Sequence, residues 1–187
     1  PFGLVALAVA VVTLMIVARM MQPTPTVTDT PQREFVADSM TETDDGGMFF
    51  INTFNDDGQY NDRWTQTDTG SVIRIINDGV YSLTNTRLDA ATTTLFRPYT
   101  FNDVNIMMEA TLLPDSARAS GYGIVFRYQD PDNYNVFAVD GLGRYSIWVR
   151  ENGQWQELRD ADDRWTRNEA ILPIAEANTL TLDIYGD

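Results

Sequence analysis

The sequence predicts an all-β domain, an antiparallel β-sandwich, preceded by one N-terminal transmembrane helix. Three observations lead to this prediction. The chain of 187 residues begins with an apolar run, continues through a segment rich in proline, threonine and aspartate, and then alternates short β-type runs with turn residues. We therefore divide it into an anchor over residues 1–21, a linker over residues 22–48 and a sandwich domain over residues 49–187.

Residues 2–18 form an uncharged, mainly apolar run of 17 residues. As a helix the run would be about 26 Å long, which is at the short limit for the hydrocarbon core of a bilayer. A cleaved signal peptide is the alternative, but its apolar region has about 7–15 residues and ends in a small-x-small site. The following Arg-Met-Met-Gln provides no such site. We expect a retained single-pass anchor whose lipid contacts include Phe2, Leu4, Leu7, Leu14 and Ile16.

The flanking charges bear on which side of the membrane the domain lies. Arg19 and Arg33 follow the apolar run, and the positive-inside rule read literally places the domain in the cytoplasm. This count omits the N-terminal flank, and our expectation is the extracytoplasmic side of the cytoplasmic membrane. The linker, with its prolines and few apolar residues, is predicted to be extended and to hold the domain away from the bilayer.

From residue 49 onward, short runs rich in Val, Ile, Phe, Tyr and Thr are separated by turn signals such as Asn-Asp-Gly and Glu-Asn-Gly. Asp-Gly and Asn-Gly pairs supply the positive φ angles that tight hairpins require. Strands are predicted at 49–54, 71–76, 80–84, 93–96, 104–112, 122–128, 134–139, 144–150, 155–158 and 179–185. No run after the anchor has a helical period, so we predict an antiparallel sandwich.

Alternation along these runs predicts which side chains share a face. In the strand predicted at 122–128, one face carries Tyr122, Ile124, Phe126 and Tyr128 and is fully apolar or aromatic, whereas the other carries smaller residues and an arginine. This pattern favours a sheet that packs on a second sheet and leaves its other face half exposed.

Residues 121–158 (GYGIVFRYQDPDNYNVFAVDGLGRYSIWVRENGQWQEL) carry a Gly-Tyr-Gly-Ile-Val-Phe-Arg strand, an Asp-Pro-Asp-Asn-Tyr turn and a Phe-Ala-Val-Asp strand. This stretch resembles the concanavalin A-like lectin/glucanase superfamily, in particular bacterial laminin-G-like domains and domains of unknown function related to family 16 glycoside hydrolases. Residues 49–64 (FFINTFNDDGQYNDRW) resemble the opening segment of that family. The resemblance covers residues 49–187 and implies a jelly-roll sandwich, but it leaves the function open.

Two departures from the family limit what the resemblance implies. The catalytic Glu-x-Asp-x-Glu or Glu-x-Asp-x-x-Glu strand of the family 16 enzymes is absent, because Glu109 is followed by Ala-Thr-Leu-Leu. The family also continues into further strands after a strand like that at 180–185, so residues 49–187 are expected to be a domain that is incomplete at its C-terminus. We predict no catalytic residues and no enzymatic activity.

Composition excludes several classes of function. The chain contains no histidine, cysteine or lysine, and all 13 of its basic residues are arginine against 27 acidic ones, for a net charge of −14. Cys–His and Ser–His catalysis, Schiff-base lysines, disulfides and imidazole or thiolate metal sites are therefore excluded. The acidic balance argues against a nucleic-acid partner, because phosphate binding depends on cationic side chains.

The hairpin at 130–133 is the best candidate for a cation site. Oxygen atoms of Asp130, Asp132 and Asn133 are the ligands that Ca²⁺ prefers. The same residue types form turns without a metal, and the loop lacks the glycine of an EF-hand at its sixth position, where Asn135 stands. A plain turn is the first interpretation and calcium the second; no other cofactor is predicted.

Aromatic side chains in the second half of the chain are the candidate ligand-binding residues: Tyr128, Tyr134, Trp148 and Trp155. Sugar rings and partner side chains stack on such groups, although aromatic residues also fill cores and pair across hairpins. Because Trp148 lies between Ile147 and Val149, it is predicted to point away from their face and to be the most exposed.

Three functions remain open. The first is a non-catalytic, membrane-anchored, extracytoplasmic sandwich that serves as a binding or scaffolding accessory subunit of a larger membrane assembly. In that case its partners are the lipid bilayer and other membrane-complex subunits. The second is a cell-surface carbohydrate-binding module that recognises a glycan. The third, which the missing glutamate motif disfavours, is a glycoside hydrolase.

Overall fold

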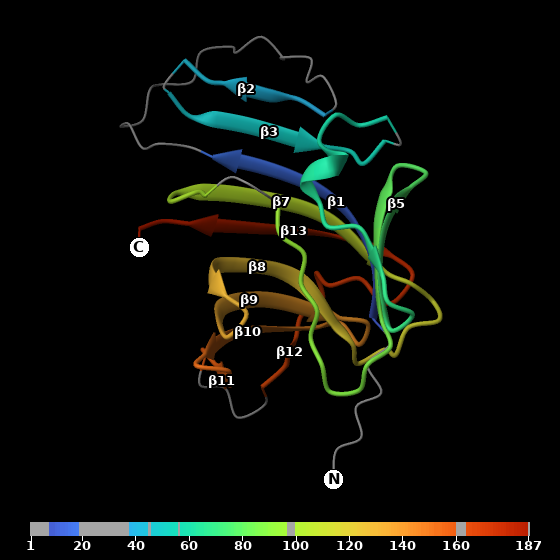
Figure 1. Cartoon of the computed structure of the whole chain (residues 1–187). Helices are drawn as coiled ribbons and strands as arrows, with labels where there is room; N and C mark the ends of the chain where they lie inside the picture. The colour runs from blue at the N-terminus through green and yellow to red at the C-terminus, as the bar shows by residue number, and fades with distance from the viewer. Residues whose placement is uncertain are drawn as a thin grey trace.

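The computed structural model describes residues 8–18, 38–44, 46–55, 57–96, 100–159 and 164–186. Within these residues the chain is all β: antiparallel strands in two sheets and a single short 3-10 helix, η1 (Asn61–Arg63), with no α-helix (Figure 1). This confirms the predicted all-β class and antiparallel pairing, and it is consistent with a sandwich.

The larger sheet has eight strands in the order β13-β7-β1-β6-β5-β4, with β3 paired to β1 and β2 paired to β3. Its strands are β1 (Ala8–Ala18), β2 (Met40–Glu42), β3 (Met48–Asn52), β4 (Thr67–Asp68), β5 (Val72–Asn77), β6 (Val80–Asn85), β7 (Val104–Leu112) and β13 (Ala177–Ile184). The smaller sheet has the order β11-β10-β9-β8, with β12 paired to β10. Its strands are β8 (Gly121–Asp130), β9 (Asn133–Asp140), β10 (Arg144–Glu151), β11 (Gln154–Glu157) and β12 (Thr166–Arg167).

Strand β1 joins three parts of the larger sheet. Its first half, residues 8–12, pairs with β6, and its second half, residues 14–18, pairs with β3. Along its other edge, residues 10–17 pair with β7. Among the described strands, the other partner of β3 is β2, that of β6 is β5 and that of β7 is β13. Every ladder that connects these three groups therefore passes through β1.

The structure differs here from the transmembrane helix predicted for the anchor, residues 1–21. Residues 8–18, which include Leu14 and Ile16, form β1 instead. Phe2, Leu4 and Leu7 lie outside the described residues. The reason is that an unbroken apolar run of this length is compatible with either a helix or a central strand, and the β-branched residues of this run favour the strand. No helix in the described part of the chain has the length and hydropathy needed to span a bilayer.

The segment predicted as a linker, residues 22–48, contributes to the larger sheet from residue 38 onward, while residues 19–37 lie outside the described part. Within it, β2 pairs with β3, and the carboxylate of Asp38, 7% exposed, accepts hydrogen bonds from Asn52 Nδ2 (2.8 Å) and the Thr53 backbone N–H (2.7 Å). A short strand and one buried carboxylate produce no hydrophobic period, so the sequence of this segment looks like that of a polar linker.

The strand predicted at 93–96 is wrong, whereas the other predicted strands coincide with observed ones to within a few residues. Residues 86–96 and 100–103 form an unpaired connection, which we call the crossing loop, between β6 and β7; Figure 1 shows it in front of the smaller sheet. Side chains rather than a strand ladder hold it. Arg74 Nη2 donates to Thr92 Oγ1 (2.5 Å) and to the Thr93 carbonyl (2.9 Å), and the hydroxyls of Tyr81 and Thr94 share a hydrogen bond of 2.8 Å.

An aromatic cluster fills the core next to the crossing loop. Phe54 and Tyr81 are fully buried, and the ring of Trp64 lies 5.3 Å from Phe54 and 5.6 Å from Tyr81 between centroids. Phe96 of the crossing loop packs 4.4 Å from Phe50 and 5.3 Å from Trp64. These contacts attach the crossing loop to β3 and β6, which places its threonines opposite the smaller sheet.

The turn between β9 and β10 is built on a buried carboxylate. Asp140 is fully buried; its Oδ2 accepts hydrogen bonds from Arg144 Nε (2.8 Å) and Nη2 (2.6 Å), and its Oδ1 accepts the backbone N–H groups of Leu142 and Arg144 at 3.0 Å. Four charge-assisted bonds therefore fix the hairpin that carries the central strands of the smaller sheet.

We expect Asp140→Asn to lower the free energy of unfolding by about 3 kcal/mol, because it removes the charge that balances the partly buried Arg144 and two of the acceptor lone pairs. The matched control is Asp132→Asn, whose carboxylate is 62% exposed and pairs with Arg150 at 3.1 Å; this change should cost less than about 1 kcal/mol. Urea unfolding followed by circular dichroism measures both. Equal losses for the two variants would show that the buried carboxylate does not hold the hairpin.

Candidate binding cleft

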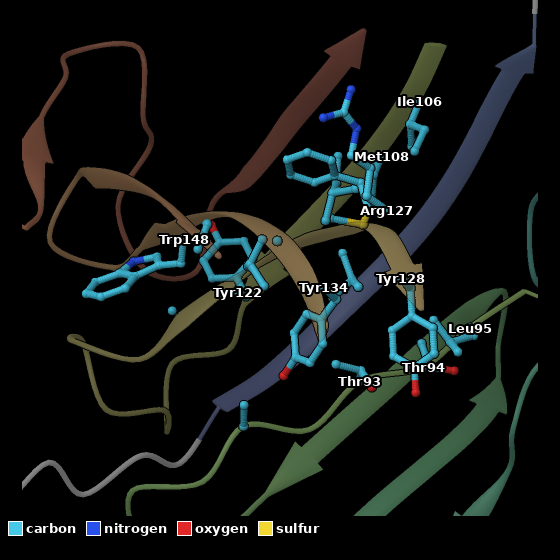
Figure 2. A pocket seen from close by; sticks show the side chains of 18 of the residues that line it. Thr93, Thr94, Leu95, Ile106, Met108, Tyr122, Arg127, Tyr128, Tyr134 and Trp148 are labelled. Atoms are coloured by element: carbon cyan, nitrogen blue, oxygen red, sulfur yellow. The ribbon is translucent and has the colours of Figure 1, made fainter. Parts of the chain in front are cut away.

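A cleft of about 1540 Å³ runs along β8 and reaches β7, β9, β10 and the crossing loop (Figure 2). Its walls therefore come from both sheets and from the connection between β6 and β7. The cleft is lined by all four aromatic side chains that were predicted to bind a ligand: Tyr128, Tyr134, Trp148 and Trp155.

These four rings form a continuous ladder. Tyr128 and Tyr134 stack with centroids 5.7 Å apart and planes at 30°. Trp155 meets Tyr134 edge-to-face at 5.5 Å, and Trp148 meets Trp155 edge-to-face at 6.4 Å. Both arrangements are favoured by the ring quadrupoles. Trp155 is 42% exposed and Trp148 is half-buried, so the prediction that Trp148 is the most exposed is wrong.

Register in the smaller sheet places three of the rings on one face. Trp148 is the cross-strand partner of Val136, and Arg150 is the partner of both Tyr134 and Trp155. Cross-strand partners point to the same side of a sheet, and side chains two residues apart on one strand do so as well. Tyr134, Trp148 and Trp155 are therefore on the same face because of strand pairing alone.

Tyr128 reaches this face through an irregularity in β8. Simple alternation predicts that Tyr128 shares a face with Tyr122, Ile124 and Phe126, which is the face opposite Tyr134. The pairing of β8 with β9 shifts register between Phe126 and Asp130, and Arg127 has a φ of 49°. A bulge of this kind re-aims the side chain that follows it. Tyr128 consequently stacks on Tyr134, and the predicted face of Tyr128 is wrong.

Arginines flank the ladder. The guanidinium carbon of Arg150 lies 5.3 Å from the Trp155 ring centroid, and that of Arg164 lies 5.9 Å from the Trp148 centroid. Both distances allow cation–π attraction. The Arg164 carbonyl accepts hydrogen bonds from Ser146 Oγ (2.5 Å) and Arg159 Nη2 (3.1 Å), which fixes the backbone beside Trp148. Sequence reasoning missed Arg164, because nothing in its neighbourhood marks it as facing a cleft.

The wall opposite the ladder is the crossing loop. Figure 2 shows the rings of Tyr128 and Tyr134 extending toward Thr93 and Thr94. The loop thus brings hydroxyl groups to the aromatic rings, a combination that suits a ligand with both hydroxyls and apolar faces. Sequence reasoning missed these threonines because it assigned 93–96 to a strand.

Carboxylates are scarce in the cleft. Of its described lining residues, Asp89 alone is acidic. Glycoside hydrolysis uses two carboxyl groups roughly 5–10 Å apart on either side of the scissile bond. The described walls therefore contain one of the two carboxyl groups that this chemistry uses.

The predicted calcium residues form a hydrogen-bonded turn outside the cleft lining. Asp130 Oδ1 accepts hydrogen bonds from Asn133 Nδ2 (3.0 Å) and from the Asp132 backbone N–H (2.7 Å), and these bonds, that of Asn133 first, lower the pKa of Asp130. Asp132 pairs with Arg150, and Asn133 Oδ1 accepts the backbone N–H of Asn152 (3.0 Å). Across the described ranges, no group of three or more His, Cys, Asp or Glu side chains gathers to hold a metal ion. Calcium binding stays a prediction.

Comparison of the chain with protein-family models, with curated proteins and with solved structures finds no match. The local geometry described above is thus the basis for any functional conclusion.

Three tyrosines in the cleft wall, Tyr81, Tyr122 and Tyr134, have a pKa raised above the ordinary 10.0, chiefly because burial disfavours the phenolate. The unfolded chain ionises at the ordinary value and the folded chain above it. Their contribution to stability is therefore complete below pH 10 and is lost as the pH rises through the raised values. We expect the free energy of unfolding in urea to fall as the pH rises above about 10.

Tyr81→Phe should make this decrease smaller, because one of the buried hydroxyls is then absent. Ultraviolet absorbance of tyrosinate measures the ionisation directly in the folded chain. If the folded chain forms tyrosinate as readily as the urea-unfolded chain, the burial of these hydroxyls does not have the stated effect.

Proposed function

We propose that this chain is a non-catalytic binding module whose aromatic cleft holds a carbohydrate. The observation that carries the proposal is the ladder Tyr128–Tyr134–Trp155–Trp148 in an open cleft. The apolar faces of sugar rings stack on aromatic faces, and the threonine hydroxyls of the crossing loop and the nearby guanidinium groups supply hydrogen bonds for sugar hydroxyls.

Two further features support a binding role. The cleft lining that the structure describes has one carboxylate, Asp89, where hydrolysis uses a pair. The net charge of −14 favours a neutral glycan over an anionic polymer, which the whole-protein field would repel. Membership of the concanavalin A-like superfamily remains part of the proposal; the two antiparallel sheets are consistent with it.

The alternative role, a membrane-anchored accessory subunit on the extracytoplasmic side, also stays a prediction. It requires the N-terminal apolar segment to lie in lipid. Because residues 8–18 pair with β3, β6 and β7, a module anchored through them would need another segment in the position of β1. The carbohydrate-binding role needs no such rearrangement, and we therefore place it first.

Binding of the full chain to a glycan array tests the proposal. Trp148→Ala and Trp155→Ala should each weaken binding to a retained glycan about tenfold, which corresponds to the ~1.4 kcal/mol expected for one aromatic stacking contact. Tyr185→Ala is the matched control, because Tyr185 is an aromatic residue 58% exposed outside the cleft lining, and it should leave affinity unchanged. Absence of binding by the intact chain, or equal effects of the three substitutions, would overturn the proposal.

A further inference from the structure

Beyond the aromatic ladder, the cleft continues into a region walled by aliphatic side chains. Alternate residues of β7 point into it, whereas Met107 and Glu109 between them are exposed on the other face. The aliphatic lining residues of this region are Val104, Ile106, Met108 and Ala110 of β7 and Ile124 of β8, whereas Val125, Val136 and Ala138 line the cleft on the face that carries the aromatic ladder. Figure 2 shows Ile106 and Met108 at the opposite end of the pocket from Thr93 and Thr94. The cleft is therefore amphipathic along its length.

Polar groups near this region are largely engaged with the protein. Tyr122 Oη accepts a hydrogen bond from Asn178 Nδ2 (2.8 Å), and Tyr81 Oη donates to the Thr65 carbonyl (2.7 Å). Among the described lining residues, the Nε1–H of Trp64 is the one buried side-chain polar atom without a hydrogen-bond partner. An apolar region that offers water so few hydrogen bonds favours hydrocarbon.

The volume of the cleft and the net charge of the chain limit the class of ligand further. The cleft, about 1540 Å³, is larger than the roughly 300–1,000 Å³ of ordinary small-molecule sites. It therefore has room for more than a short sugar. The net charge of −14 disfavours a ligand with a carboxylate, such as a fatty acid. Of the two arginines in the lining, Arg127 already donates a hydrogen bond to the Tyr185 carbonyl (3.1 Å), so it is engaged with the protein and not with a ligand.

We infer that the ligand is a neutral alkyl glycoside or glycolipid. Its sugar lies on the aromatic ladder, and its hydrocarbon chain lies against Ile106 and Met108 of β7. This inference rests on the proposed carbohydrate-binding function and extends it by naming the class of ligand.

The test is a series of n-alkyl β-glucosides, from methyl to nonyl, titrated into the 187-residue chain below their critical micelle concentrations. Fluorescence of the tryptophans in the cleft reports binding. Each added methylene should tighten binding about fourfold, the factor expected for burial of one CH₂ group. The inference is overturned if hexyl and nonyl glucosides bind within about twofold of the methyl glucoside.

Straight-chain alcohols of the same lengths separate this inference from the proposed function. If the sugar contributes, each glucoside binds more tightly than the alcohol of equal chain length, and both proposals stand. If alcohols and glucosides bind equally and both gain about fourfold per methylene, the hydrocarbon site stands and the carbohydrate function fails. If the methyl glucoside binds and the series is flat, the hydrocarbon inference fails alone.

A conservative variant locates the hydrocarbon site. Ile106 is partly buried and lines the cleft, and Ile106→Thr keeps a β-branched side chain while introducing a hydroxyl. It should weaken nonyl glucoside about tenfold, as expected for a polar group left unpaired against a hydrocarbon chain, and leave methyl glucoside unchanged. Ile147→Thr, half-buried outside the cleft lining, is the matched control and should change neither. Equal effects of the two substitutions would show that the hydrocarbon chain does not lie against Ile106.

Discussion

Strand β1 forms backbone pairs along both edges, with β7 on one side and with β6 and then β3 on the other. Among the described strands, three groups that have no other ladder between them meet at this one strand. The position of β7, which presents Ile106 and Met108 to the cleft, depends on that pairing. Because side chains alternate along a strand, a slip of one residue between β1 and β7 would turn these residues to the other face.

Within the smaller sheet, strand register and one bulge determine which aromatic side chains line the cleft. Regular pairing of β9, β10 and β11 places three aromatic rings on one face, and the bulge in β8 adds Tyr128. The positive φ of Arg127 has a conformational cost for a residue with a Cβ atom, and bulges of this type are common beside functional sites. The crossing loop, attached by Arg74 and Phe96, completes the opposite wall. Separate elements thus converge on one amphipathic cleft.

Much of this architecture could be predicted from the sequence, because Asp-Gly and Asn-Gly turns separate β-branched and aromatic runs from residue 71 onward. The four aromatic residues proposed to bind a ligand also meet in one cleft. Other features leave no sequence signal. An unbroken apolar run such as residues 8–18 fits a helix as well as a central strand. The bulge after Phe126 interrupts alternation without a glycine or proline, and residues 93–96 have β propensity but are held by side-chain contacts.

Amide hydrogen exchange over residues 8–18 in the 187-residue chain tests the central claim, that β1 holds the larger sheet together. The account predicts that these amides are protected to the same extent as those of β7 and exchange in the same cooperative opening, because β7 has one neighbour in β1. If β7 and β13 are protected while residues 8–18 exchange at the rate of an unstructured peptide, β1 is not the strand that joins the sheet. The position of β7 in the cleft wall would then not depend on β1.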